Sequence, residues 1–394
     1  MQSTDEAIAR LRAAARPCCG VDTVPLARAA GCVLARSVRS TRDVPPADNS
    51  AMDGYAFRWD DWPGPSRALP VSARVAAGVA PGTLAPGTAA RIFTGAEIPQ
   101  GADTVVMQEH TRATADGVVI EKRPERCANV RPRGQDIGKG REILPAGRRL
   151  RPQELGLLAS VGLATVEVYR PLRVAVVSNG DELVEPGTEL APGQIYNSNR
   201  YLLAGLFGGW GFEVTDLGVA GDDPGEVEAR LLAAAERADV IVSSGGVSVG
   251  EEDHVCDVVA RLGALDLWKI AMKPGKPLAF GRVGETPFIG LPGNPASALV
   301  TALVVARPFL FDCQGRADAI VEPVPLPARF RRRGGPRRSY LRVRREAGGL
   351  TPYPNQSSGV LLSACWGDGL AVQEVDRDIT EGDAVPWLAY ASLC

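Results

Sequence analysis

The sequence predicts a multidomain α/β protein organised around a central doubly wound domain. Its 394 residues are too many for one typical domain. Between residues 171 and 315, short apolar segments rich in β-branched residues alternate with segments of helical periodicity. This alternation is typical of a parallel sheet that is covered by helices on both faces. Short strands separated by turns precede and follow this region, so we expect two further β-rich parts.

The composition is that of an ordinary water-soluble globular protein. Hydrophobic residues make up 45% of the chain, charged residues make up 23%, and the net charge is −2. Because the net charge is close to zero, we expect no general affinity for nucleic acid or for a membrane surface. The polar N-terminus lacks a signal-peptide pattern, and the longest apolar stretch, 296–306, is too short to cross a bilayer. We therefore expect a cytoplasmic protein.

Cysteine and histidine usage argues against a structural zinc site. The eight cysteines include no CxxC pair, and the chain has two histidines. The adjacent pair Cys18 and Cys19 is either redox-active or a set of incidental buried thiols, and we favour the second interpretation.

The N-terminal part begins with a helix and continues into turns. Ser3 and Glu6 form a capping-box pattern, and Pro17 ends the helix. We expect a second helix over 26–37. The segment 44–56 combines prolines, an asparagine and two acids, and it is either a functional loop or a linker built on Asx turns.

Short strands follow and predict a small β-rich domain. The strand-like segments are 71–75, 90–93, 104–107 and 117–120. The pattern returns to helix over 146–169, with Pro152 near its start.

The central region places polar side chains at the ends of strands. We expect strands at 173–178, 212–218, 240–242, 278–280 and 288–291, and helices at 201–207, 227–235 and 296–306. Ligands of such sheets bind beyond the carboxyl ends of the strands. Glu182, Asp222, Asp253 and Ser297 would all lie at that edge.

The segment 238–277 carries the chemistry that is easiest to interpret. Its strand runs into Gly245 and Gly246, where the backbone turns tightly before a helix begins. Free backbone N–H groups beside a helix N-terminus form an anion site. Asp253 would repel that anion unless a divalent cation lay between them, so Asp253 is a candidate Mg²⁺ ligand.

Lys269, Lys273 and Lys276 follow, and their ammonium groups are suited to oxyanions. The plainer interpretation is an ordinary glycine turn with solvated lysines. Neither a GxxxxGK[ST] P-loop nor a GxGxxG fingerprint is present. The turn, the carboxylate and the lysines within one short stretch favour the functional interpretation.

The last part, 316–394, predicts a small β-barrel or sandwich with strands near 340–343, 359–362 and 370–374. Nine arginines lie between residues 329 and 345. They form either a phosphate or nucleic-acid patch or a solvated strand face. We favour the solvated face for most of them and a ligand role for one.

Eight motifs, in order along nearly the whole chain, resemble those of the molybdopterin molybdenumtransferases, a family that includes the E domain of gephyrin. The motifs are DNSAMDGYAFR from Asp48, RIFTGAEIPQGADTVVMQE from Arg91, VRPRGQDI from Val130, SNGDEL from Ser178, GQIYNSN from Gly193, SSGGVSVGEED from Ser243, WKIAMKPGKPLAFG from Trp268 and GLPGNPAS from Gly290.

The resemblance implies an elongated homodimer of four-domain subunits in molybdenum cofactor biosynthesis. The implied domains are a discontinuous N-terminal mixed domain (1–42 plus 141–170), a small β-rich domain (43–140), a MogA-like α/β molybdopterin-binding domain (171–315) and a C-terminal β-barrel (316–394). The implied reaction inserts molybdate into adenylylated molybdopterin with the help of Mg²⁺ and releases AMP. The implied site lies between the central domain of one subunit and the small β-rich domain of the other.

The resemblance also implies site residues. The catalytic acids would be Asp53, Asp136, Glu182, Asp222 and Asp253, of which Asp222 and Asp253 would bind Mg²⁺. Substrate and molybdate would contact Thr94, Gly245, Gly246, Ser248, Lys269, Lys273, Lys276 and Ser297, with Arg342 and Ser358 as anion contacts near the C-terminus. One departure is Asn179, where the family usually has Thr beside the acid that corresponds to Glu182.

Two alternatives stay open. One is the molybdopterin adenylyltransferase of the preceding step, whose central domain is similar but which usually lacks the motifs at 48–56 and 91–109. The other is a non-catalytic molybdopterin-binding scaffold, which the filled acid and lysine positions disfavour. We expect the adenylyltransferase and molybdoenzyme maturation proteins as partners. Molybdate and tungstate both remain candidate anions.

Overall fold

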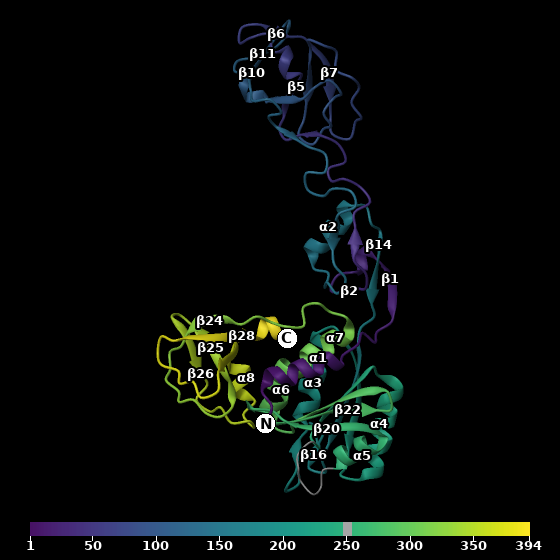
Figure 1. The fold of residues 1–394 in the computed structure, drawn as a ribbon, viewed down its shortest axis with the longest axis vertical. Coiled ribbons are helices and arrows are strands. Elements are labelled where there is room, and N and C mark those ends of the chain that lie inside the picture. Colours follow the sequence, from purple (N-terminus) through teal and green to yellow (C-terminus); the bar gives the residue numbers. More distant parts are fainter. Residues whose placement is uncertain (247–253) are drawn as a thin grey trace.

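The computed structural model describes residues 1–246 and 254–394. Figure 1 shows an elongated molecule with two well separated ends. A small β-rich region that includes β5 (Gly54–Phe57) lies at one end. At the other end, the region with β22 (Pro277–Val283) lies beside the region with β25 (Arg338–Glu346). Within one chain, the residues around β5 are therefore remote from the regions that contain β22 and β25.

Helix α1 (Thr4–Ala14) begins at the predicted capping box. The Ser3 N–H donates to Glu6 Oε2 at 2.7 Å, and the Glu6 N–H donates to Ser3 Oγ at 3.2 Å. The buried face of α1, which includes Leu11, packs on α7 (Arg307–Gln314). The N-terminal helix is thus part of the core of the central region.

A small three-stranded antiparallel sheet joins the two ends of the molecule. Its order is β1–β14–β2, and the elements here are β1 (Val21–Pro25), η1 (Leu26–Arg28), β2 (Val33–Leu34), β3 (Val38–Arg39), β13 (Glu142–Leu144), α2 (Pro152–Ser160) and β14 (Thr165–Tyr169). The helix expected over 26–37 is wrong, because Gly31 takes a left-handed φ of 78° and Val33 and Leu34 are buried by pairing with β14. The helix expected over 146–169 is limited to α2.

Two larger sheets and one two-stranded sheet build the β-rich end. The orders are β7–β8–β5–β9, β10–β11–β6 and β12–β4. The elements are β4 (Asn49–Ser50), η2 (Trp59–Asp61), β6 (Ala68–Leu69), β7 (Val71–Val75), β8 (Ala89–Ile92), β9 (Thr104–Met107), η3 (Gln108–His110), β10 (Thr111–Thr114), β11 (Gly117–Ile120) and β12 (Val130–Arg131). The four predicted strands are confirmed as β7, β8, β9 and β11, with small boundary shifts.

The central region contains a six-stranded mixed sheet in the order β18–β15–β19–β23–β22–β20. The strands not yet placed are β15 (Arg173–Asn179), β18 (Glu213–Ala220), β19 (Val240–Ser244), β20 (Gly263–Lys269) and β23 (Thr286–Leu291), beside a two-stranded pair of β16 (Leu183–Val184) and β17 (Ile195–Tyr196). The first four strands of the order are parallel, whereas β22 runs antiparallel to β23 and β20 runs antiparallel to β22. The carboxyl ends of β15, β18, β19 and β23 therefore meet at one edge.

Helices cover both faces of this sheet, as predicted. They are α3 (Ser198–Gly209), α4 (Pro224–Arg237), α5 (His254–Leu262) and α6 (Pro295–Thr301), which continues through η4 (Ala302–Ala306) into α7. Helices α4 and α5 bury their apolar sides on one face, while α1, α3, α6 and α7 pack on the other. The helical run 295–314 is long and apolar enough to cross a membrane, but 89% of its most apolar window is buried inside the protein. It is therefore a core helix.

The C-terminal region is a strongly paired sheet in the order β21–β25–β27–β28–β24, with β26 beside β25. Its elements are β21 (Met272–Lys273), β24 (Val324–Pro327), β26 (Gly349–Pro352), α8 (Leu362–Trp366), β27 (Gly369–Gln373), β28 (Ala384–Ala389) and α9 (Tyr390–Leu393). The expected barrel is not confirmed, because the described sheet is open. The strand expected at 359–362 is wrong, since a turn and α8 occupy this segment.

Candidate functional site

A cavity of about 970 Å³ lies where the carboxyl edge of the central sheet meets the C-terminal sheet. The central region contributes residues from the loops after β15, β18, β19 and β23, and from the start of α6. The lysine loop (residues 273–277) and the C-terminal segments 332–337 and 354–358 complete its lining. This is the edge at which the sequence places its acids.

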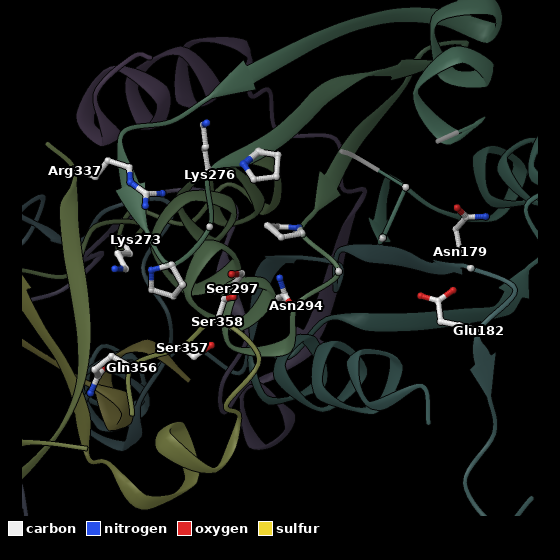
Figure 2. Close-up of a pocket in the computed structure, with 18 of the residues that line it drawn as sticks. Asn179, Glu182, Lys273, Lys276, Asn294, Ser297, Arg337, Gln356, Ser357 and Ser358 are labelled. Atoms are coloured by element: carbon white, nitrogen blue, oxygen red, sulfur yellow. The ribbon is translucent and has the colours of Figure 1, made fainter. Parts of the chain in front are cut away.

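Opposite charges occupy opposite sides of the cavity. In Figure 2, Glu182 lies on one side, and Lys273, Lys276 and Arg337 lie on the other. Glu182 and both lysines are solvent-exposed, so their charges are available to a ligand. The basic side of the cavity therefore suits a negatively charged ligand. The carboxylate on the other side is available to a second part of that ligand or to a cation.

Asp222 lines the cavity and is held in place by two reciprocal hydrogen bonds with Asp181, which is its neighbour in space. The Asp181 N–H donates to Asp222 Oδ2 at 3.2 Å, and the Asp222 N–H donates to Asp181 Oδ1 at 3.0 Å. The two turns that follow β15 and β18 are held together by these bonds. Glu182 and Asp222 are thereby presented from adjacent turns to the same space.

Asn179 ties the same two turns together. Its buried amide Nδ2 donates to the carbonyl oxygens of Ala220 and Gly221, at 3.2 and 3.1 Å. Asn179 also lines the cavity. The residue that departs from the usual Thr of the family therefore makes two hydrogen bonds that set the position of Asp222.

Gly245 and Gly246 form a part of the wall where no side chain fits. Both adopt left-handed φ values, of 89° and 68°. A Cβ at Gly245 would lie 2.7 Å from the Asn179 carbonyl oxygen, and a Cβ at Gly246 would lie 2.4 Å from a Val255 methyl carbon. Both predicted glycines line the cavity, and their backbone is open to a ligand.

The lysine loop is fixed from two directions. Strand β21 pairs in parallel with β25, so that Lys273 lies opposite Ser339, and the Ile270 N–H donates to the Lys276 carbonyl oxygen at 2.9 Å. Gly275 has a φ of 95°, and a Cβ there would lie 2.3 Å from Thr301 Oγ1. Lys273 and Lys276 therefore project from a tightly seated turn.

The start of α6 brings Ser297 to the cavity. Ser297 is buried and lines the cavity, and Asn294 precedes the helix (Figure 2). The Ala296 N–H donates to the Ser358 carbonyl oxygen at 3.0 Å, so the helix start is joined to the C-terminal loop. Ser358, which the resemblance implies as an anion contact near the C-terminus, also lines the cavity.

Several predicted residues do not line the described cavity. Lys269 is exposed at the end of β20. Arg342 is 1% exposed, and it donates to Ser363 Oγ and to the Ser357 carbonyl oxygen, both at 2.9 Å. The geometry therefore gives Arg342 a role in holding the loop at 356–358 and no direct ligand contact. Ser248 and Asp253 lie outside the described residues.

Asp53 directly precedes β5 and Thr94 follows β8, so both belong to the β-rich end, which is remote from the cavity in the same chain (Figure 1). Asp136 lies between β12 and β13 and does not line the cavity. Asp53 Oδ1 accepts from both the N–H and the hydroxyl of Thr94, each at 2.7 Å. These bonds, led by the one from the backbone, lower the pKa of the Asp53 carboxyl below its usual value. The half-buried Asp53 carboxylate is thus held in place by the exposed Thr94.

The structure adds cavity residues that sequence reasoning missed. They are Asn294, Arg332, Arg337, Gln356 and Ser357. The signal for the arginines is the basic run at 329–345, but a run of nine does not reveal which side chains face a ligand. Gln356 is fixed by bonds in both directions to the backbone of Arg342, at 2.9 and 3.0 Å.

Glu182 and Asp222 are the described carboxylates that could contribute to a cation site. Among the described residues, no group of three or more His, Cys, Asp or Glu side chains has metal-binding geometry. Two oxygen donors nevertheless suit Mg²⁺, which is usually held by one or two carboxylates together with water and substrate phosphates.

Comparison with known proteins places the chain in a family. Residues 2–162 match the MoeA N-terminal region (domain I and II), residues 175–312 match a probable molybdopterin binding domain, and residues 323–390 match the MoeA C-terminal region (domain IV). The molybdopterin molybdenumtransferase of Haemophilus influenzae is 44% identical over 293 residues, 74% of this chain and 72% of that protein. The chain belongs to the molybdopterin molybdenumtransferase family.

Other members of the family are similar to this chain in sequence and in fold. The molybdopterin molybdenumtransferase of Nostoc sp. is 42% identical, with 78% of this chain and 72% of that protein covered. Molybdopterin molybdenumtransferase 2 of Mycobacterium tuberculosis is 40% identical, with 81% and 80% covered. Two crystal structures of the molybdopterin biosynthesis MoeA protein of Pyrococcus horikoshii have TM-scores of 0.83 and 0.85 at 32% and 26% identity, and both cover 98% of this chain and at least 98% of theirs. The family fold extends along the whole chain.

Proposed function

We propose that this chain inserts molybdate into adenylylated molybdopterin, releases AMP and so forms the molybdenum cofactor. The observation that carries the proposal is a cavity lined by Glu182 and the half-buried Asp222, in which Glu182 lies opposite the exposed Lys273 and Lys276 (Figure 2). Both reactants are anions, so a site that joins them must offset their negative charge at two places. The names of the related proteins support the same reaction class.

The lysine side of the cavity would hold the oxyanion. Molybdate is a tetrahedral dianion, and ammonium groups bind such anions as point charges. Lys273 and Lys276 supply two of them, and Ser297 supplies a hydroxyl donor at the start of a helix. This set of donors would hold molybdate without any metal.

The carboxylate side would hold the phosphoanhydride through Mg²⁺. Glu182, Asp222 and the predicted ligand Asp253 would bind the ion, which would neutralise charge on the phosphate groups during cleavage. Asn179 would keep Asp222 in place through its two amide bonds.

A homodimer would bring the remote acids to the site. Asp53 and Thr94 lie at the far end of their own chain, so only the β-rich region of a second subunit can place such residues at this cavity. We propose this arrangement together with the four-domain division given above. Isologous pairing of two copies would then build two equivalent sites.

The first test follows nucleotide release from adenylylated molybdopterin with molybdate and Mg²⁺. Lys276→Ala should slow release by about 100-fold, because it removes one of the charges that offset the oxyanion. Lys122→Ala is the matched control, since it removes an exposed lysine from a turn of the β-rich end and should release AMP at the normal rate. Equal rates for the two variants would contradict the assignment of the lysine side.

The same assay separates the alternatives. Turnover of ATP with free molybdopterin would identify an adenylyltransferase. Adenylylated molybdopterin that binds and stays intact in the presence of both ions would identify a scaffold. Replacing molybdate by tungstate shows which anion the site accepts.

A subunit-mixing experiment tests the shared site. Asp53→Asn and Asp222→Asn homodimers should both be inactive. In a heterodimer of the two, one site combines both changes and the other is intact, so random mixing should restore about one quarter of the normal activity. No recovery in heterodimers confirmed by mass spectrometry would exclude a site shared in this way.

A further inference from the structure

A cluster of three thiols lies away from the cavity, where the segment after α1 crosses α7. The Cys18 N–H donates to the Cys313 carbonyl oxygen at 3.0 Å. Cys18 Sγ and Cys19 Sγ lie 3.6 and 3.8 Å from the same oxygen. Cysteines that are 295 positions apart in sequence are therefore held side by side.

The three thiols differ in exposure and in acidity. Cys18 is exposed, Cys19 is partly buried and Cys313 is 1% exposed. Hydrogen bonds from the Cys19 and then the Cys313 thiol lower the pKa of Cys18 well below its usual value, and the same interactions raise the pKa of the two donors. The exposed thiol is thus the one that carries negative charge most easily, and charged thiols are the reactive form.

A second cavity, of about 560 Å³, gives access to this cluster. Cys18 and Cys313 both line it, over a floor that includes Phe280 and Phe309. Arg16 lies on its rim and donates from Nη1 to the carbonyl oxygens of Ala13 and Ala15, at 2.9 and 2.7 Å, and its other guanidinium N–H groups can meet a carboxylate. The acids on the rim have partners of their own: Asp266 pairs with Arg10 at 3.6 Å, and Glu285 pairs with Arg282 at 2.8 Å. A small molecule with a sulfur atom and a carboxylate fits these surroundings.

We propose that Cys18 is a site of thiol–disulfide exchange with low-molecular-weight disulfides, and that Cys313 closes an internal disulfide with it. In the first step the Cys18 thiolate attacks one sulfur of the small disulfide. The S–S bond of the small disulfide breaks, one half stays on Cys18 as a mixed disulfide, and the other half leaves as a thiolate. In the second step the Cys313 thiol attacks the Cys18 sulfur, the second small thiol leaves, and its proton comes from Cys313. Two protein thiols are oxidised and one small disulfide is reduced to two thiols.

The backbone contact favours Cys313 as the second thiol. A disulfide requires two main chains that lie side by side, and the hydrogen bond from the Cys18 N–H to the Cys313 carbonyl oxygen, at 3.0 Å, holds them in this way. The site is independent of the proposed reaction, because none of its residues lines the larger cavity. The proposal concerns a modification that nothing in the family names describes.

The test uses the reduced full-length protein and oxidised glutathione, with alkylation of unreacted thiols and peptide mass mapping over time. Cys18 should react at least about tenfold faster than Cys127 and Cys365, which are also exposed and serve as internal controls. The product should be a Cys18–Cys313 linkage that dithiothreitol reverses. Equal rates at Cys18, Cys127 and Cys365 would overturn the first step.

Variants separate the two steps. Cys313→Ser should accumulate Cys18 as a stable mixed disulfide with glutathione, whereas Cys19→Ser should still form the internal disulfide. Loss of the internal disulfide in Cys19→Ser would overturn the choice of Cys313. Cys18→Ser should abolish both products, and circular dichroism checks that each variant is folded. If Cys313→Ser does not fold, direct detection of the Cys18–Cys313 peptide pair in the normal protein decides the second step.

Discussion

Gly275 provides a sharp test of how the lysine loop is built. It lies between Lys273 and Lys276 with a φ of 95°, and a Cβ there would lie 2.3 Å from Thr301 Oγ1. Gly275→Ala therefore adds two penalties. Left-handed backbone costs an alanine about 1–2 kcal/mol, and forcing a methyl group into a packed site costs about 1–3 kcal/mol. We expect a total loss of about 2–5 kcal/mol in the free energy of unfolding.

Gly284 is the matched control. It lies in the turn between β22 and β23 with a φ of 57°, and a Cβ there would meet nothing within 4 Å. Gly284→Ala should therefore pay only the penalty for left-handed backbone, so its free energy of unfolding should fall by about 1 kcal/mol. Urea denaturation of both variants measures the difference. The Gly275→Ala protein should also release AMP about 10–100-fold more slowly, because a shift of about 1 Å misplaces both ammonium groups.

A double-mutant cycle isolates the steric part. Thr301 Oγ1 is buried and has no hydrogen-bond partner in the described structure, so Thr301→Ala removes the clashing atom without breaking a bond. In the Gly275→Ala background this change should recover about 1–3 kcal/mol. The reasoning fails if Gly275→Ala is no less stable than Gly284→Ala, or if Thr301→Ala recovers nothing.

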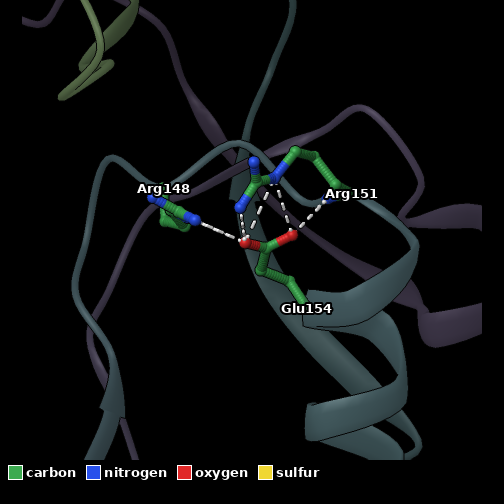
Figure 3. A network of polar contacts seen from close by, with 3 residues as sticks. All are labelled: Arg148, Arg151 and Glu154. Carbon is green, nitrogen blue, oxygen red and sulfur yellow. Dashed lines mark hydrogen bonds and ion pairs between the residues drawn. The ribbon is translucent and has the colours of Figure 1, made fainter.

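Three more predictions concern hydrogen-bonded groups. Glu154 accepts from Arg148 and Arg151, each at 2.6 Å (Figure 3), and bonds led by those from Arg151 lower its pKa from 4.5 to about 2. Its stabilisation is complete above pH 4.5 and is lost as the pH falls towards 2, so Glu154→Gln should cost about 2 kcal/mol at pH 7 and progressively less in acid, by urea titration. Asn179→Ala should raise the Mg²⁺ concentration needed for half-maximal AMP release several-fold while Asn179→Thr retains activity; equal Mg²⁺ curves would contradict its positioning role. Arg342→Lys should lose about 2–3 kcal/mol in thermal denaturation and raise KM more than it lowers kcat, and an unchanged KM would exclude the loop-holding role.

Much of the central region follows from local pattern. Continuous apolar, β-branched segments predict β15 and β19 because strands buried on both faces need no alternation. The acids Glu182 and Asp222 are predictable because the carboxyl ends of parallel strands meet at one edge. Strand β20 has no such pattern, since it is an edge strand that is exposed along much of its length.

Other features depend on contacts that local sequence does not encode. The segment 26–37 has helical periodicity, but pairing of Val33 and Leu34 with a strand 130 residues away wins over local propensity. Arg342 and Arg337 share one basic run, but Arg342 lies within β25 and is buried, whereas Arg337 precedes β25 and lines the cavity. The distance between Asp53 and the cavity is a property of the whole elongated chain.

The pairing of β21 with β25 has a consequence for how ligands enter. The lysine loop is covalently part of the central region, yet it forms the edge strand of the C-terminal sheet. The Arg338 N–H adds a bond to the Ala271 carbonyl oxygen at 2.9 Å, and the Arg338 guanidinium binds Asp5 of α1. The central region and the C-terminal sheet therefore share strand β21 and are also joined by the contacts of Arg338. These contacts prevent the two regions from moving apart to open the cavity. We expect substrates to diffuse into a rigid, preformed mouth, with selectivity set by fixed geometry and not by closure.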